Sequence, residues 1–197
     1  MPESPANSWP GRLPQDGGLM RHHHPSRHPH HHHRRTHHRP TPPGDSGAVH
    51  LLHPGDVVCA ERGDTLETLL GSCIAVLLSD RKRTVAAMCH IVHCRPSVSA
   101  SARTTASADG AIDALYTLLQ KRALTPRLCD AFVCGGGNMF PGLAAQNPVG
   151  AENARWVLQR LATDGVNVEG TDLGGNTYRR LRWVVGPTSP TVIAVDV

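Results

Sequence analysis

The sequence predicts an α+β fold that follows a long N-terminal segment without structure. Three observations lead to this expectation. Short apolar, β-branched runs recur from residue 56 to the C-terminus, polar turns join neighbouring runs, and only two segments carry helical periodicity. Antiparallel hairpins with two helices favour an α+β arrangement over a doubly wound parallel sheet. The sequence contains no internal repeats.

The first 46 residues are expected to be disordered. They contain ten of the fourteen His, many Pro and Gly, and almost no large aliphatic or β-branched residues. A His-rich tract of this kind could gather zinc, nickel or copper. Its low complexity points to no particular role, and we assign it none. Residues 47–197 are then expected to form one domain.

The composition of the folded part excludes several classes of protein. The tail carries six Arg against Glu3, Asp16 and Asp45, so its net charge is +3 and residues 47–197 keep only +1 of the total +4. No basic surface for nucleic acid is therefore indicated. No apolar run approaches the length of a membrane span, and the N-terminus lacks the apolar core of a signal peptide. We expect a cytosolic protein whose six cysteines are thiols.

Each expected element follows from a local pattern. Residues 109–122 carry apolar positions at helical spacing after a cap at Ser107 or Asp109, and residues 148–163 form a second helix that Pro148 opens and Gly165 stops. Strands are expected at 56–60, 66–70, 74–80, 84–93, 128–134, 166–169, 180–185 and 191–197. The Gly186-Pro187 turn makes a hairpin of the last two strands, and the Ser, Thr and Ala stretch 95–108 is expected to be a loop.

Cys73 and His90 are the most informative pair. A two-residue loop at 81–82 between the runs 74–80 and 84–93 would make them direct cross-strand partners on one face of a sheet. Directly opposed Cβ atoms lie about 4.5 to 5.5 Å apart. An imidazole at that range converts a thiol to the thiolate-imidazolium form that attacks carbonyl carbon. For an isolated pair, a buried core thiol and a structural histidine are the alternatives.

Two glycine-containing turns flank this pair. Gly71 and Ser72 let the backbone turn sharply before the thiol and leave N–H groups beside it, which would suit an oxyanion hole, although an ordinary glycine bend gives the same pattern. The run 135–138 (GGGN) follows a strand, but it lacks the P-loop Lys-Ser/Thr and the G-x-G-x-x-G pattern. We interpret it as a tight turn, functional or structural, and not as a nucleotide site.

The remaining cysteines leave a structural zinc site open. Cys89 with Cys94 and Cys129 with Cys134 share a C-x4-C spacing, which is looser than that of the usual zinc knuckle. His93 lies beside the first pair, but its odd offset from His90 places it across the sheet. Packing in the core is the other interpretation for these thiols.

Taken together, these motifs resemble the CheD family, the chemoreceptor glutamine deamidases of bacterial chemotaxis. Five segments carry the resemblance in family order between about Leu52 and the C-terminus: Thr68–Val76, Met88–His90, Phe132–Phe140, Gly150–Asn153, and Asp172–Asn176 followed by Arg179. Five ordered motifs are far more specific than any one of them. The resemblance implies a three-layer α/β/β sandwich. It also implies hydrolysis of receptor glutamine, and sometimes asparagine, carboxamides without metal or cofactor.

The resemblance also implies residue roles and partners. Cys73 is the implied nucleophile, His90 its base and Thr68 the third member, with Thr65 close enough to be an alternative. Methyl-accepting chemoreceptors are the implied substrates, and a chemotaxis phosphatase of the CheC type is an implied partner. A member that had lost its activity would act only as a regulatory binding partner, and a zinc-stabilised structural domain is a third alternative.

The sequence departs from the family pattern at three places. Cys89 stands where the family has asparagine, Tyr178 stands where glycine precedes the arginine, and the aromatic residue expected near Ser107 is missing. In the expected register Cys89 points away from Cys73, which favours a packing role. These changes bear on substrate affinity more than on the chemistry.

Overall fold

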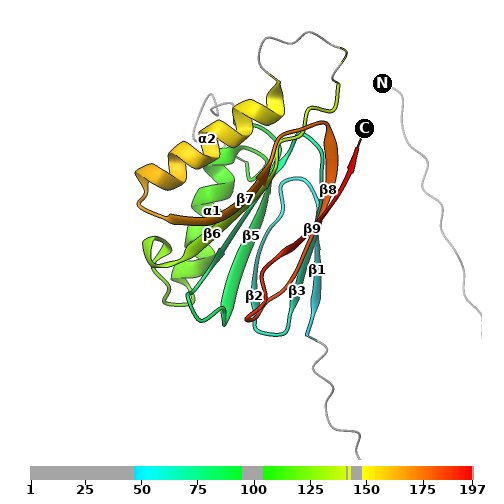
Figure 1. Cartoon of the computed structure of the whole chain (residues 1–197). Coiled ribbons are helices and arrows are strands. Elements are labelled where there is room, and N and C mark those ends of the chain that lie inside the picture. The colour runs from blue at the N-terminus through cyan, green and yellow to red at the C-terminus, as the bar shows by residue number, and fades with distance from the viewer. Residues whose placement is uncertain (1–46, 95–103, 141, 143–147, 197) are drawn as a thin grey trace, which may run out of the picture. The chain divides into compact units, whose positions relative to one another are not determined.

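A computed structural model describes residues 47–94, 104–140, 142 and 148–196 (Figure 1). The expected tail, residues 1–46, and most of the expected loop 95–108 lie outside the described residues. None of the helices in the described part is long and apolar enough to cross a membrane.

The described strands form two sheets. In chain order the elements are β1 (Val49–Leu52), β2 (Val57–Glu61), β3 (Thr65–Leu70), β4 (Ile74–Ser79), β5 (Val85–Ile91), α1 (Ala108–Gln120), the 3-10 helix η2 (Pro126–Leu128), β6 (Asp130–Gly135), α2 (Val149–Thr163), β7 (Asn167–Leu173), β8 (Thr177–Val184) and β9 (Thr191–Asp196). The central sheet has the strand order β2-β5-β4-β6-β7, and the outer sheet has the order β1-β3-β8-β9.

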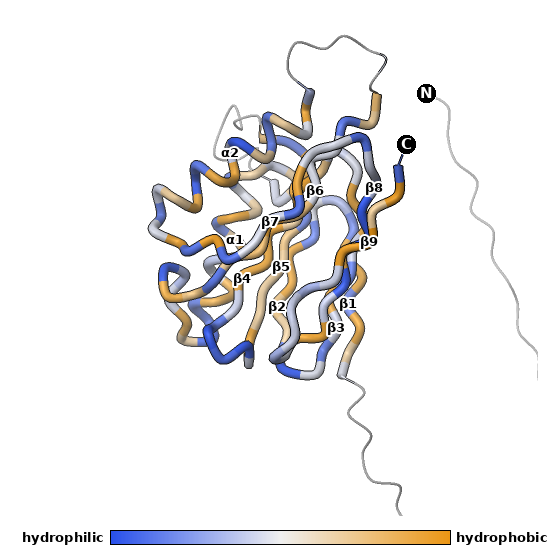
Figure 2. Tube along the Cα trace, in the orientation of Figure 1, coloured by the Kyte–Doolittle hydropathy of each residue, from blue (hydrophilic) through white to orange (hydrophobic). Residues whose placement is uncertain are grey.

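Two apolar clusters hold three layers together. Alternate residues of β4 point to opposite faces, so Ile74 and Val76 pack with α1 and α2, whereas Ala75 and Leu77 pack against the outer sheet. The helices therefore cover one face of the central sheet and the outer sheet covers the other (Figure 1). Figure 2 shows hydrophobic residues along the central strands and mixed colouring on the helices. The expected α+β, three-layer α/β/β sandwich is confirmed.

Most expected elements are present, with small shifts at their ends. The helix α1 begins after Ser107, which occupies the N-cap position, and α2 begins after Pro148. The last two strands form the expected antiparallel hairpin. The strand β1, a four-residue edge strand that pairs in parallel with β3, was not predicted from the sequence. A parallel pair also joins β6 to β7, so the sheets are not purely antiparallel.

The register of the β4–β5 hairpin differs from the prediction. Ala75, and not Cys73, is the direct partner of His90, and Ser79 pairs with Ala86. The predicted two-residue loop at Arg81 and Lys82 is therefore wrong. Because the displacement is two residues, Cys73 keeps the same face as Ala75 and His90.

Asp80 is the physical reason for the longer turn. Its carboxylate accepts hydrogen bonds from the backbone N–H groups of Lys82, Thr84 and Val85, at 3.1, 2.7 and 2.8 Å. Arg83 adopts a left-handed conformation with φ of 51°. Burial alone would raise the pKa of Asp80, but the N–H groups of Val85 and Thr84 outweigh it and lower that pKa. Side-chain capping of this kind favours the four-residue turn 81–84.

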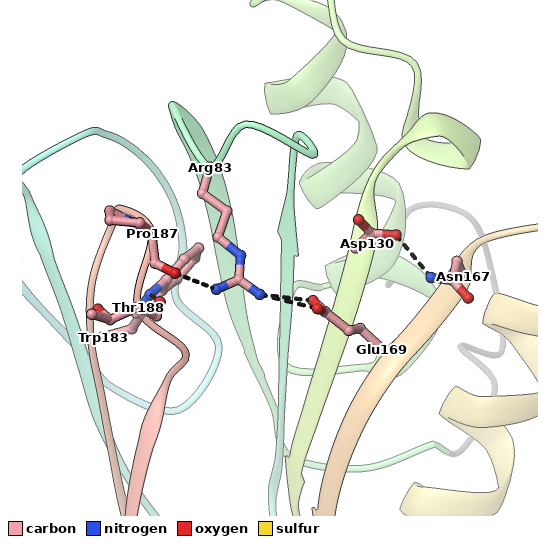
Figure 3. Close-up of polar contacts among 7 residues, drawn as sticks. All are labelled: Arg83, Asp130, Asn167, Glu169, Trp183, Pro187 and Thr188. Carbon is pink, nitrogen blue, oxygen red and sulfur yellow. Dashed lines mark hydrogen bonds and ion pairs between the residues drawn. The ribbon is translucent and has the colours of Figure 1, made fainter.

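Arg83 then joins the turn to both sheets. Its guanidinium donates to the Glu169 carboxylate on β7 at 3.0 and 3.1 Å, and to the Pro187 carbonyl in the β8–β9 turn at 3.1 Å (Figure 3). In the same region Trp183 Nε1 donates to the Thr188 carbonyl at 2.7 Å, which closes the β8–β9 turn. At the end of the sandwich that holds the β4–β5 and β8–β9 turns, polar contacts therefore connect the two sheets.

We predict that Arg83→Ala lowers the free energy of unfolding by about 1 kcal/mol, because one partly exposed ion pair and one hydrogen bond to a backbone carbonyl are lost. Urea unfolding of the full chain measures the change. Arg81→Ala, at an exposed position of the same turn, is the matched control and should change stability little. Equal effects of the two substitutions would show that the contacts of Arg83 do not join the sheets.

Candidate active site

The chain crosses from the outer sheet to the central sheet through a three-residue corner, Gly71–Cys73. All three carbonyls of this corner accept hydrogen bonds: from the N–H groups of Gly137 at 2.9 Å and Gly136 at 2.8 Å, and from the Asn153 side-chain amide at 3.2 Å. In a trans peptide the carbonyl and the next N–H point in opposite directions. The N–H groups of Ser72 and Cys73 are therefore directed away from these donors.

Residues 135–137 are glycines because their backbone packs directly against this corner. A Cβ at Gly135 would lie 2.2 Å from the Cys73 carbonyl oxygen, and φ is 117° at Gly135 and 67° at Gly136. Only glycine adopts these conformations at such close approach. The N–H groups of Gly136 and Gly137 are already used by the corner carbonyls. The tight-turn interpretation explains the run without a bound phosphate.

His90 lies between the two sheets, with 2% of its surface exposed. Its Nδ1 is 2.8 Å from the Thr68 hydroxyl, and that hydroxyl donates to the Leu52 carbonyl at 2.8 Å. A hydroxyl has one hydrogen, so Thr68 must accept from His90, which places the ring proton on Nδ1. The other ring nitrogen, Nε2, is buried and has no hydrogen-bond partner among the described residues. A neutral His90 thus presents a free lone pair at Nε2.

Of the two threonine candidates, Thr68 is the one that contacts His90. Thr68 lies on β3 and reaches across to His90 on β5. Thr65, three residues earlier, alternates to the other face of the strand. The Leu52 carbonyl that orients the hydroxyl comes from β1, the strand that was not predicted from the sequence. In the sequence, the short, mostly apolar run 49–52 before Pro54 could have indicated this strand.

Cys73 and His90 share a face but are not direct partners. Cys73 packs with the apolar cluster between the sheets, two residues before Ala75, the partner of His90. Diagonal neighbours of this kind have Cα atoms about 7 to 8 Å apart, within reach of a long or aromatic ring side chain. The prediction of a common face is confirmed, and the prediction of direct opposition is wrong.

Burial shifts both groups toward their neutral forms. It raises the pKa of the Cys73 thiol. It also lowers the pKa of His90, against smaller opposing effects of the Leu52 carbonyl and Asp56. A low-dielectric setting disfavours any charged form. Burial therefore favours the neutral thiol and the neutral imidazole over the thiolate-imidazolium form expected from the sequence.

A hollow of about 400 Å³ reaches Thr68 and His90 from the side of β1. Its lining includes Leu51, Leu69 and Arg180, which lie on the outer face of the outer sheet. A second hollow of about 390 Å³ shares Glu67 and Arg180 with it. His90 lines only the first of these hollows, and Cys73 lines neither.

The other cysteines lie in different layers of the described part of the chain. Cys89 and Cys129 pack on the helix side of the central sheet, whereas Cys134 packs between the sheets. Burial raises the pKa of Cys89 to about 12, which agrees with the packing role expected for it. The described residues contain no group of three or more His, Cys, Asp or Glu side chains able to hold a metal ion. The zinc alternative has no ligand cluster there.

Two residues of the C-terminal motif also lie near the corner. Arg179 is buried beside Leu70 and donates from Nε to the Asp172 carboxylate at 2.9 Å. Tyr178, one of the departures noted above, lies against Gly71: a Cβ at Gly71 would be 3.2 Å from its ring. The sequence indicated these residues only through the family resemblance, because neither carries a local pattern of its own.

We predict that Thr68→Val changes the tautomer of His90. In the native chain, long-range nitrogen-proton correlation NMR should show a neutral His90 ring protonated at Nδ1 and bare at Nε2. Without the hydroxyl this preference should be lost, and stability should fall by about 1 to 3 kcal/mol because the buried Leu52 carbonyl loses its donor. Thr65→Val is the control and should leave the His90 signals unchanged. An Nε2-protonated ring in the native chain would contradict the assignment.

Comparisons with known proteins place the chain in a family. The family model described as CheD, chemotactic sensory transduction, matches residues 95–189. That range contains the glycine run, Asn153 and Arg179, and it begins after Cys73 and His90.

Curated relatives extend the match. The probable chemoreceptor glutamine deamidase CheD 2 of Chromobacterium violaceum is 33% identical over 130 residues, which cover 65% of this chain and 64% of that protein, less than two thirds of its length. The protein of the same name from Geobacter sulfurreducens is 30% identical over 130 residues, covering 66% of this chain and 79% of that one. The probable chemoreceptor glutamine deamidase CheD of Methanococcus vannielii is 31% identical over 125 residues, covering 64% and 81%. This chain belongs to the CheD family.

Proposed function

We propose that this chain hydrolyses the side-chain amide of glutamine on chemoreceptor proteins, giving glutamate and ammonia. The carrying observation is the buried His90 ring, which Thr68 holds at Nδ1 so that the Nε2 lone pair has no partner among the described residues, on the face that Cys73 shares. The substrate class rests on the names of the relatives, which are probable chemoreceptor glutamine deamidases.

The first half of the proposed reaction forms a thioester. The Cys73 sulfur attacks the amide carbon while its proton passes to Nε2 of His90, and the carbonyl oxygen becomes an oxyanion. The imidazolium then gives that proton to the amide nitrogen. The carbon–nitrogen bond breaks, ammonia leaves, and the neutral His90 is restored.

The second half consumes water. A water molecule loses a proton to Nε2 of His90 as its oxygen attacks the thioester carbon. The carbon–sulfur bond breaks and the sulfur regains a proton from His90. The products are a glutamate side chain and the free Cys73 thiol. The sum is amide plus water to carboxylic acid plus ammonia, with no other reactant.

Backbone N–H groups of the corner are the proposed oxyanion donors. The three corner carbonyls are held by Gly136, Gly137 and Asn153, so the Ser72 and Cys73 N–H groups keep a fixed direction. Fixed dipoles cost no reorganisation when the charge forms. A Cβ at Gly71 would lie 2.8 Å from the Met139 sulfur, so a larger residue there would require the Met139 side chain to move. The cytosolic location and the CheC-type partner stay predictions from the sequence.

We predict that Cys73→Ser abolishes ammonia release from a glutamine-containing receptor fragment and that His90→Gln lowers it about 10²- to 10⁴-fold, the usual contribution of a general base. Cys59→Ser is the matched control, since Cys59 is a half-buried thiol packed on the helix side of the central sheet. Mass spectrometry of the fragment and an ammonia assay measure the products. Full activity of the Cys73→Ser protein would rule out the proposed nucleophile.

We predict a single acid limb in the pH dependence of kcat/KM. The base must be neutral, and burial lowers the pKa of His90, so the rate should rise through an inflection below about 6.5, the ordinary value for imidazole. Burial raises the pKa of Cys73, so no second rise is expected near 8.5, where a free thiol ionises. A rate that kept rising through that region would show that a preformed thiolate, and not the neutral pair, reacts.

A further inference from the structure

We propose that Asn153 is a positioning residue that holds the corner carrying Cys73 and the strand carrying His90 in one geometry. This inference rests on the proposed function and concerns the same site. Asn153 lies in the second turn of α2 and is fully buried, with 0% of its surface exposed. It comes from the opposite side of the central sheet to Thr68, so the two residues hold the pair from different layers.

The amide of Asn153 connects two distant parts of the chain. Its Nδ2 donates to the Ser72 carbonyl at 3.2 Å and to the Val92 carbonyl at 2.9 Å. Ser72 directly precedes Cys73, and Val92 follows His90 by two residues. Cys73 and His90 are diagonal and not direct partners, so the strand ladder alone does not set their separation. The two hydrogen bonds of one planar amide add that constraint.

The orientation of this amide follows from its surroundings. Both groups in front of Nδ2 are carbonyl oxygens, which only accept hydrogen bonds. If the amide were turned over, its own oxygen would face both of them. The native orientation leaves Oδ1 buried with no hydrogen-bond partner among the described residues. An apolar side chain would fill this volume without a desolvated acceptor, so packing alone does not account for an asparagine.

The start of α2 is shaped to bring Asn153 this close. A Cβ at Gly150 would lie 2.4 Å from the Gly136 carbonyl oxygen, so the first turn of the helix touches the glycine run directly. Gly136 in turn donates its N–H to the Cys73 carbonyl. The helix, the glycine run and the corner therefore form one continuous set of backbone contacts with Asn153 at its centre.

The predicted effect of removing the amide is on the rate and not on substrate binding. We expect Asn153→Ala and Asn153→Asp to lower kcat about 10- to 100-fold with little change in KM, because a misplacement of about 1 Å between reacting groups costs up to about 10²-fold. The aspartate keeps the volume but sets a carboxylate against two carbonyl oxygens. Val157→Ala is the matched control: Val157 is equally buried on the same helix and packs in the apolar cluster, and its side chain cannot hydrogen-bond to the corner.

A second measurement does not depend on turnover. Alkylation of Cys73 by a trace of iodoacetamide, followed by peptide mapping of the full chain, reports how well His90 takes the thiol proton at each pH. In the native chain the rate should rise through the pKa of His90 and again at the pKa of the thiol. The Asn153 variants should lose the lower limb and keep the upper one. Val157→Ala should keep both limbs.

The outcomes separate the two proposals. If the native chain releases no ammonia and Cys73 alkylation shows no lower limb, the proposed function fails. If the native chain is active and the Asn153 variants keep kcat and the lower limb, the positioning role alone is overturned. Equal losses in the folded Asn153 and Val157 variants would overturn it as well, since helix packing would then explain both. Loss of kcat and of the lower limb in the Asn153 variants only supports it.

Discussion

One hydroxyl hydrogen, that of Thr68, determines the state of the whole site. It is donated to the Leu52 carbonyl, and for that reason the hydroxyl oxygen can only accept from His90. Nδ1 therefore carries the ring proton and Nε2 carries the lone pair. The three groups come from β1, β3 and β5, so the tautomer of the histidine exists only when the outer and central sheets are assembled.

This arrangement explains why the site lies between layers and not in a surface loop. The corner that carries Cys73 is the point where the chain leaves one sheet for the other. The glycine run at the end of β6 holds it from the central sheet, and α2 holds it from the helix layer. Every layer thus contributes a hydrogen bond to the position of either the thiol or the imidazole. Precision of this kind is easier on strands and helices than on mobile loops.

The sequence predicted the layers and the shared face better than the contacts. Hydrophobic periodicity located both helices. In the β4–β5 hairpin, the residues expected on one face remain on one face after the register shift of two residues, because side chains alternate between faces with a period of two. The displacement itself came from the Asp80 carboxylate capping three N–H groups and from the left-handed Arg83, which no pattern in the run 80–83 required. Tertiary contacts decided the turn.

Contacts between residues that are far apart in the sequence could not be predicted from it. The strand β1 is only four residues long and at an edge, so its apolar run was too short to stand out. Asn153 sits among ordinary helix residues, and its two carbonyl partners are 81 and 61 residues away. No local spacing encodes such contacts. The family resemblance indicated the segment around Asn153 without assigning any role to it.

Burial gives the site a reactivity different from that of an exposed thiolate. Desolvation raises the pKa of Cys73, as it raises those of Cys89 and Cys134 to about 12, so charge alone does not distinguish the proposed nucleophile. The proposed distinction is geometric: Cys73 shares a face with His90, whose buried Nε2 has no hydrogen-bond partner among the described residues. In the proposed mechanism, the fixed N–H groups of the corner stabilise the negative charge that forms on the substrate carbonyl oxygen. Selectivity then comes from access and alignment, which the fold provides, and not from a standing negative charge.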